Sequence, residues 1–213
     1  KIWNAYRLIN GWTVDETLAQ SDNNALAVEW FRNAFAKALA EIEDNFSSYR
    51  ISEAFMRIYK LFWDDFSGWY LEIVKPAYGS PADRKTIDAT RHYFDMLMRL
   101  IHPFMPFVTE EIWQDLTPRA KGESIMYAPA PAVEQWDEAL LTRFEFVKEA
   151  ITDIRNVRKQ KNIAQKQPLT LKVIVDENYP ASYAPVIVKM GNISAIETVT
   201  EKDPAAAAFI VKT

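Results

Sequence analysis

The sequence contains no cysteine and only two histidines, His92 and His102. The lack of cysteine excludes a disulfide framework, a thiolate zinc site and a cysteine nucleophile, and it fits a reducing compartment. Two histidines are too few for most metal sites built on imidazole, so we expect no metal site. His102 precedes a proline in an aromatic-rich turn, where we prefer a packed, hydrogen-bonded role to a catalytic one.

The sequence also lacks the motifs of an enzyme active site. Neither a GxxxxGK[ST] nor a GxGxxG phosphate-binding loop is present, and no Ser/His/Asp arrangement can be argued from two histidines. We therefore expect no catalytic residue and no cofactor in this chain. No apolar run approaches the roughly 18–20 residues that span a bilayer, and no signal sequence is present, which predicts a cytoplasmic protein without membrane association.

Glycine is scarce, with 5 residues among 213, while 49% of the residues are hydrophobic. Apolar residues recur mostly at helical spacing, which predicts a mainly α body. The segment 51–74 carries two apolar stripes, so we expect it to be the central helix of a bundle. Helices are expected at about residues 2–10, 24–45, 51–74, 82–101, 110–116 and 137–163, the last with Asp137 as its N-cap.

The composition changes after Pro168, where a short run of β-branched residues begins. Residues 169–175 and 196–200 are strand-like and enclose a predicted helix at 182–190. We therefore predict a helical domain over 1–168 and a small βαβ-like segment over 169–213, whose tail over 203–213 starts with alanines and then becomes strand-like. The chain begins in what reads as mid-helix and stops without a terminating element, which predicts a piece of a longer protein.

The formal net charge of −4 disfavours a generally basic nucleic-acid surface, so an RNA site would have to be a local patch. Residues 155–162 carry four positive charges and no negative one. Lys148, Arg155 and Lys159 share a helical face beside Arg158, and such a face can follow a phosphate backbone. A solvated face that complements the helix dipole is the simpler alternative, and charge alone favours it.

A second candidate is Arg50, at the start of the predicted central helix. Free backbone N–H groups at a helix N-terminus already favour phosphate, and unstacked bases of RNA loops are gripped by aromatic stacking and by arginine. One arginine at a helix start is a weak signal by itself.

Four strings of the sequence resemble those of valyl-tRNA synthetases, and they occur in that family's order. They are IWNAYR at 2–7, WDDFSGWYLE at 63–72 followed by KP at 75–76, HPFMPFVTEEIW at 102–113, and IRNVR at 154–158 with NI at 162–163. The WYLE form points to the valine enzymes rather than to their isoleucyl and leucyl relatives.

The resemblance implies a fold, an activity and a partner. The fold would be a class I synthetase anticodon-binding helical bundle, followed by a small α/β subdomain leading toward a coiled-coil arm. The parent enzyme would be a monomer that ligates valine to tRNA(Val) with ATP and edits its product. This chain would recognise the anticodon stem-loop of tRNA(Val) and carry no catalysis or cofactor itself.

The resemblance also implies RNA-binding positions. In the family an Arg-Phe pair at the start of the central helix reaches the anticodon loop. Arg50 matches the Arg, whereas Ile51 replaces the Phe and so removes a ring that can contribute about 1–3 kcal/mol per stacked base. The strings also contain Arg7, Arg155 and Arg158, and Lys159 and Lys161 of the basic patch complete the expected tRNA contacts. The signature tryptophans Trp63, Trp69 and Trp113 are expected to build the core.

Two alternatives stay open at this point. The acidic charge and the aromatic content also fit a helical protein-interaction scaffold. The equivalent domain of an isoleucyl-tRNA synthetase would share the HPFMP string.

Overall fold

The computed structural model describes residues 1–175, 179–204 and 206–211. The chain forms two compact units, Lys1–Trp136 and Asp137–Thr213. The predicted tail strand is not found at residues 203–204 and 206–211, while residues 205 and 212–213 lie outside the described part. Among the described residues, no helix is both long enough and apolar enough to cross a membrane.

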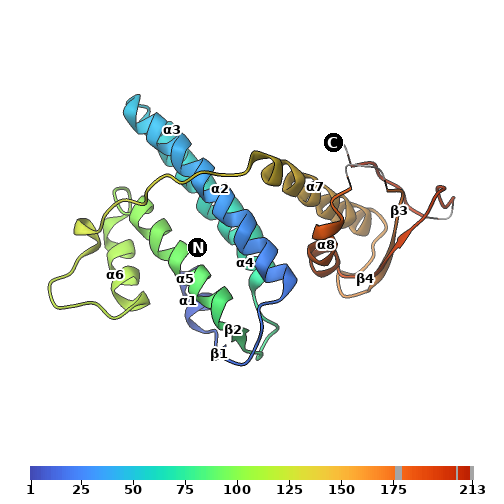
Figure 1. Cartoon of the computed structure of the whole chain (residues 1–213), viewed down its shortest axis with the longest axis horizontal. Helices are drawn as coiled ribbons and strands as arrows, with labels where there is room; N and C mark the ends of the chain where they lie inside the picture. The colour runs from blue at the N-terminus through green and yellow to red at the C-terminus, as the bar shows by residue number, and fades with distance from the viewer. Residues whose placement is uncertain (176–178, 205, 212–213) are drawn as a thin grey trace. The chain divides into compact units, whose positions relative to one another are not determined.

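The first unit is a helical bundle, as the sequence predicts (Figure 1). The long helix α2 lies beside a second long helical segment made of α3, η1 and α4, and the two form a hairpin. Short parallel pairing of β1 with β2 joins the loops at the opposite end of this hairpin. The elements are α1 (Ile2–Asn10), β1 (Val14–Asp15), α2 (Asp22–Ser47), α3 (Ile51–Lys60), η1 (Leu61–Tyr70), α4 (Leu71–Val74), β2 (Ala82–Asp83), α5 (Arg84–Ile101), α6 (Pro106–Leu116) and η2 (Ile125–Tyr127).

Buried aromatic rings form the core of this unit. Phe31 on α2 lies with its ring centroid 5.4 Å from that of Phe66 and 4.9 Å from that of Tyr70. Phe94 on α5 also stacks on Phe66, with the ring centroids 5.8 Å apart. Such ring pairs stabilise a core beyond the area that they bury. Burial raises the pKa of the neighbouring Tyr93 to about 12, because its phenolate would lose hydration in the core.

The central helix differs from the continuous α-helix predicted over 51–74. Its middle third, η1, is a π-helix of ten residues, in which backbone N–H groups bond five residues back. The segment contains the adjacent pair Ser67 and Gly68, and such pairs are recognised sites at which the regular α-helical ladder is interrupted. The inward rings of Phe62 and Phe66 remain stacked through it, so the core is kept.

The second unit contains α7 (Glu138–Gln160), β3 (Leu169–Val173), η3 (Ala181–Tyr183), α8 (Ala184–Gly191) and β4 (Ile193–Thr198). Strands β3 and β4 pair in parallel, and α8 lies between them in the chain, which confirms the predicted βαβ-like order. Asp137 caps α7 as predicted, because its carboxylate accepts a 3.0 Å bond from the Leu140 N–H.

The division between the units lies earlier than the boundary predicted at 168/169. The apolar stripe of α7 is buried within the second unit, where the Phe144 ring meets that of Tyr183 at 5.7 Å. Near its end, Ile154 lies against the backbone of Gly191, where an added Cβ would be 3.3 Å from the Ile154 side chain. Helix α7 therefore supplies most of the buried hydrophobic side chains described in the second unit, and its helical spacing alone could not reveal that it packs there.

Candidate nucleic-acid interface

The tip of the hairpin is the turn at which α2 ends and α3 begins. Tyr49 adopts a left-handed conformation with φ of 56°. The N–H of Arg50 donates to the carbonyl of Asn45 at 2.8 Å, and the N–H of Tyr49 donates to that of Phe46 at 3.0 Å. This pair of bonds is a Schellman motif, which satisfies the last carbonyls of a helix. The turn places Tyr49, Arg50 and Ile51 at the apex.

Two side chains of α2 hold the Arg50 guanidinium in place. Its Nη2 lies 2.5 Å from the Asp44 carboxylate, and its Nε donates to the Asn45 side chain at 3.0 Å. The Arg50 side chain remains 49% exposed, so a ligand can still reach it. Because Asp44 offsets its charge, Arg50 is better suited to a base than to a phosphate group.

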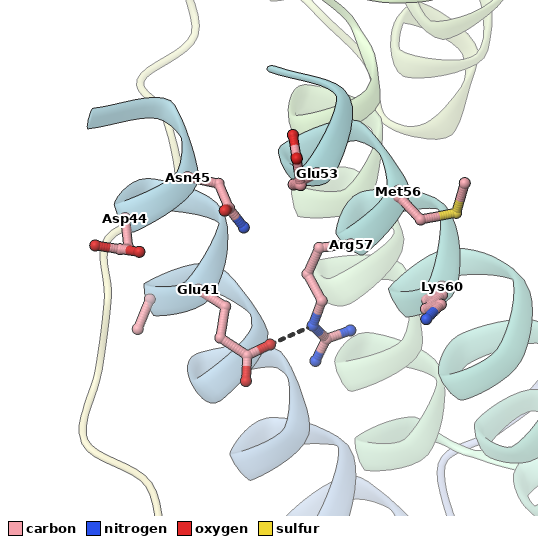
Figure 2. Close-up of a pocket in the computed structure, with 8 residues that line it drawn as sticks. Glu41, Asp44, Asn45, Glu53, Met56, Arg57 and Lys60 are labelled. Carbon is pink, nitrogen blue, oxygen red and sulfur yellow. Dashed lines mark hydrogen bonds and ion pairs between the residues drawn. The ribbon is translucent and has the colours of Figure 1, made fainter. Parts of the chain in front are cut away.

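A hollow of about 620 Å³ lies on one side of the hairpin, below the tip (Figure 2). Arg57 from α3 crosses it to form an ion pair with Glu41 of α2, and its Nη1 lies 3.7 Å from Asp65. These pairs tie α3 to α2 and neutralise Arg57. The hollow is lined by Ala40, Glu41, Asp44, Asn45, Glu53, Met56, Arg57 and Lys60.

Aromatic side chains also gather near the tip, which the sequence did not reveal. Phe104, in the turn between α5 and α6, has its ring centroid 6.4 Å from that of Phe46 and 4.8 Å from that of Phe55. Phe46 and Phe55 are each more than one third exposed, and Phe107 is 90% exposed. The HPFMPF string contains two of these rings, Phe104 and Phe107, but it gives no sign of Phe46 and Phe55. That string also contains His102, whose Nδ1 is hydrogen-bonded to the Thr109 hydroxyl at 2.7 Å, which confirms its structural role.

The structure does not bring Arg7 to the tip. Arg7 is exposed on α1, which packs against α5 and α6. In Figure 1 this short helix lies toward the end of the bundle at which β1 and β2 pair, far from the α2–α3 turn. Arg7 therefore cannot share an RNA loop nucleotide with Arg50.

The basic end of α7 is only partly available to a ligand. Lys159 and Lys161 are exposed, and Arg155 is half-buried on the face that it shares with Lys159. The last turn of a helix carries a partial negative charge, which these cations offset. The phosphate contacts expected of these three residues stay a prediction.

Arg158 has a different role from the one predicted. It is 2% exposed, and its guanidinium donates to the carbonyls of Ala164, Gln167, Gly191 and Asn192 at 2.8–3.0 Å. These acceptors lie in the loop after α7 and at the C-terminal end of α8. The burial argues against an RNA contact, and we assign Arg158 to the fold of the second unit.

Comparisons with known proteins agree with the strings in the sequence. The family described as "Anticodon-binding domain of tRNA ligase" matches residues 28–175. Proteins named valine–tRNA ligase match the whole chain, with 52% identity in Parabacteroides distasonis, 51% in Bacteroides thetaiotaomicron and 32% in Thermotoga maritima. The chain spans 24% of the length of each of these relatives. The predicted resemblance is confirmed, and the chain belongs to the family of anticodon-binding domains of tRNA ligases.

Proposed function

We propose that this chain recognises the anticodon stem-loop of tRNA(Val) as part of a valine–tRNA ligase. The observation that carries the proposal is the match of the entire chain, at about half identity, to proteins of that name. The parent protein would join valine to tRNA(Val) with ATP and act as a cytoplasmic monomer. This chain would contribute RNA recognition and hold no cofactor.

The charges of the two candidate surfaces favour different contacts. At the tip, the carboxylates of Asp44 and Glu53 accompany Arg50 and repel phosphate, while they can accept hydrogen bonds from base amino groups. The exposed rings near the tip can stack on bases. At the end of α7, Lys159 and Lys161 carry positive charge suited to the backbone. We therefore assign base contacts to the tip and phosphate contacts to α7.

Substituting Arg50 tests the base contact. Arg50→Ala should weaken binding of tRNA(Val) about 10-fold, since a side-chain contact to a base contributes about 1–3 kcal/mol of discrimination. Binding of the same tRNA with a swapped anticodon should weaken much less. Dissociation constants of both RNAs for both proteins provide the measurement. Equal losses on the two RNAs would show that Arg50 makes no sequence-dependent contact.

Arg84 offers a matched control for this experiment. It is an exposed arginine of the same unit, 45% exposed against 49% for Arg50, and it is likewise paired with a carboxylate, that of Glu16. It lies at the start of α5, away from the tip (Figure 1). Arg84→Ala should leave both affinities at the values of the parent chain.

The phosphate contacts of α7 predict a change in salt dependence. Lys159→Ala and Lys161→Ala should each reduce the slope of log affinity against log salt by about 0.7–0.9, because each lysine neutralises one phosphate. Titration of tRNA(Val) at several salt concentrations gives this slope. Lys121→Ala, which removes an exposed lysine from the loop between α6 and η2, should leave it unchanged. Unchanged slopes for both α7 variants would remove α7 from the interface.

A protein-interaction scaffold remains the competing function. Absence of tRNA(Val) binding even at low salt, together with tight binding to a purified protein partner, would support it. A preference for tRNA(Ile) over tRNA(Val) would instead favour the isoleucine-specific relatives.

A further inference from the structure

Tyr49, at the apex of the tip, has a backbone conformation that its side chain disfavours. Its φ of 56° lies in the left-handed region, where a bulky side chain crowds the backbone. Glycine is the usual residue at this place in a Schellman motif. The other non-glycine residues with positive φ in the described chain are Asn162 and Asn192, and asparagine tolerates this region. Tyr49 therefore lowers the stability of its own turn.

No interaction of the Tyr49 side chain in the described part of the chain compensates for this strain. The Tyr49 side chain is 89% exposed, so it buries almost no apolar surface. Within the described part of the chain, its ring and hydroxyl have no aromatic or hydrogen-bond partner. Strained residues of this kind cluster at ligand-binding sites, where the ligand supplies the missing interaction.

The surroundings of Tyr49 determine the ligand chemistry. Asp44 and Glu53 make the tip unfavourable for a lone phosphate group. A phenol ring instead offers an uncharged face, and any unpaired base can stack on it regardless of its hydrogen-bonding edge. Ile51, two residues after Tyr49, is 48% exposed but has no ring on which a base could stack.

We propose that the Tyr49 ring is the platform on which one unpaired base of the bound RNA loop stacks. Arg50, held by Asp44 and Asn45, then approaches the same loop from the adjacent position. The ring lies on the turn between α2 and α3 and is 89% exposed, so a splayed base can reach it. This assignment rests on the proposed function, because it requires that the tip bind RNA.

Tyr49→Gly separates stacking from stability, because the two should move in opposite directions. The variant should bind tRNA(Val) about 10- to 100-fold more weakly, the loss expected for one stacked base. Relief of the strain should raise the unfolding midpoint of the first unit, followed by tryptophan fluorescence, by about 2–4 °C. Tyr49→Phe keeps the ring and should retain the parent affinity. Tyr78→Gly is the matched control, since Tyr78 is a fully exposed tyrosine on the loop between α4 and β2 and should not affect binding.

A fluorescent base reports the stacking directly. 2-Aminopurine is substituted in turn at each unpaired position of the anticodon loop. At one position its fluorescence should be quenched by the unsubstituted chain and by Tyr49→Phe, but not by Tyr49→Gly. If Tyr49→Gly binds and quenches as the unsubstituted chain does, the assignment of Tyr49 is overturned while the proposed function stays intact. Failure of the parent chain to bind tRNA(Val) would overturn both.

Discussion

Arg158→Ala is expected to destabilise the second unit by about 3–5 kcal/mol. The substitution removes a buried guanidinium and leaves four carbonyl acceptors without their donor. Hydrogen bonds to a charged donor contribute about 1.5–3 kcal/mol each, and their effects do not add fully when they share one group. The loss should therefore approach the upper end of what single substitutions cause.

Hydrogen exchange resolved by peptide is the suitable measurement, because the chain has two units and a single unfolding transition cannot be assumed. Protection should fall in peptides of α7, α8 and β4 and stay unchanged in the first unit. Arg158→Lys should recover little, since one ammonium group cannot reproduce the planar fork. Lys159→Ala, one residue away and exposed, is the control and should change stability by about 0.5 kcal/mol or less. Normal protection in Arg158→Ala with a reduced salt slope would instead mean that Arg158 contacts RNA.

Phe66→Ala is expected to destabilise the first unit by about 3–5 kcal/mol, the usual range for a buried phenylalanine. Phe66 is fully buried, and the rings of Phe31, Phe94 and Tyr70 lie within 5.8 Å of it. Its removal opens a cavity where α2, η1 and α5 meet. Tryptophan fluorescence during urea unfolding reports this unit selectively, because every tryptophan of the sequence precedes residue 137.

Trp63 provides the control for this experiment because it lies in the same π-helical segment. It is 37% exposed, stacks on Tyr59 at 5.3 Å and carries the Lys1 ammonium 3.8 Å above its ring. Trp63→Phe should therefore lower the free energy of unfolding of the first unit by much less than Phe66→Ala does. Equal losses would mean that the core is centred on the outer face of η1.

The helices could be predicted because their apolar spacing is a local property. Helices α5 and α6 end at the expected residues 101 and 116, although α6 begins four residues earlier than expected, and Asp137 caps α7 as its preference predicts. The signature tryptophans show the limit of such reasoning. Trp113 is buried as expected, whereas Trp63 is partly exposed on the outer face of its helix. A string can identify a family without showing which of its residues face the core.

The π-helix could not be predicted, because its sequence has the same apolar spacing as an α-helix and only the Ser67–Gly68 pair marks the interruption.

Only those features of the candidate site that depend on local sequence could be predicted. Arg50 and Ile51 lie at the start of α3, as the sequence indicated. Arg158 was misassigned because its acceptors come from turns up to 34 residues away, and a charge pattern on one helix contains no information about them. The cluster of Phe46, Phe55 and Phe104 could not be predicted either, because its rings come from three separate segments of the chain. The strain at Tyr49 depends on a φ value that no side-chain pattern specifies.

Protection of tRNA(Val) nucleotides by this chain tests the central claim most directly. Chemical probing of the free and bound RNA should show protection concentrated in the anticodon loop and the adjoining stem. The loop protection should weaken in Arg50→Ala, while the stem protection should remain. Protection confined to the acceptor stem, or no protection at concentrations that saturate binding, would contradict the assignment of the α2–α3 tip to anticodon recognition.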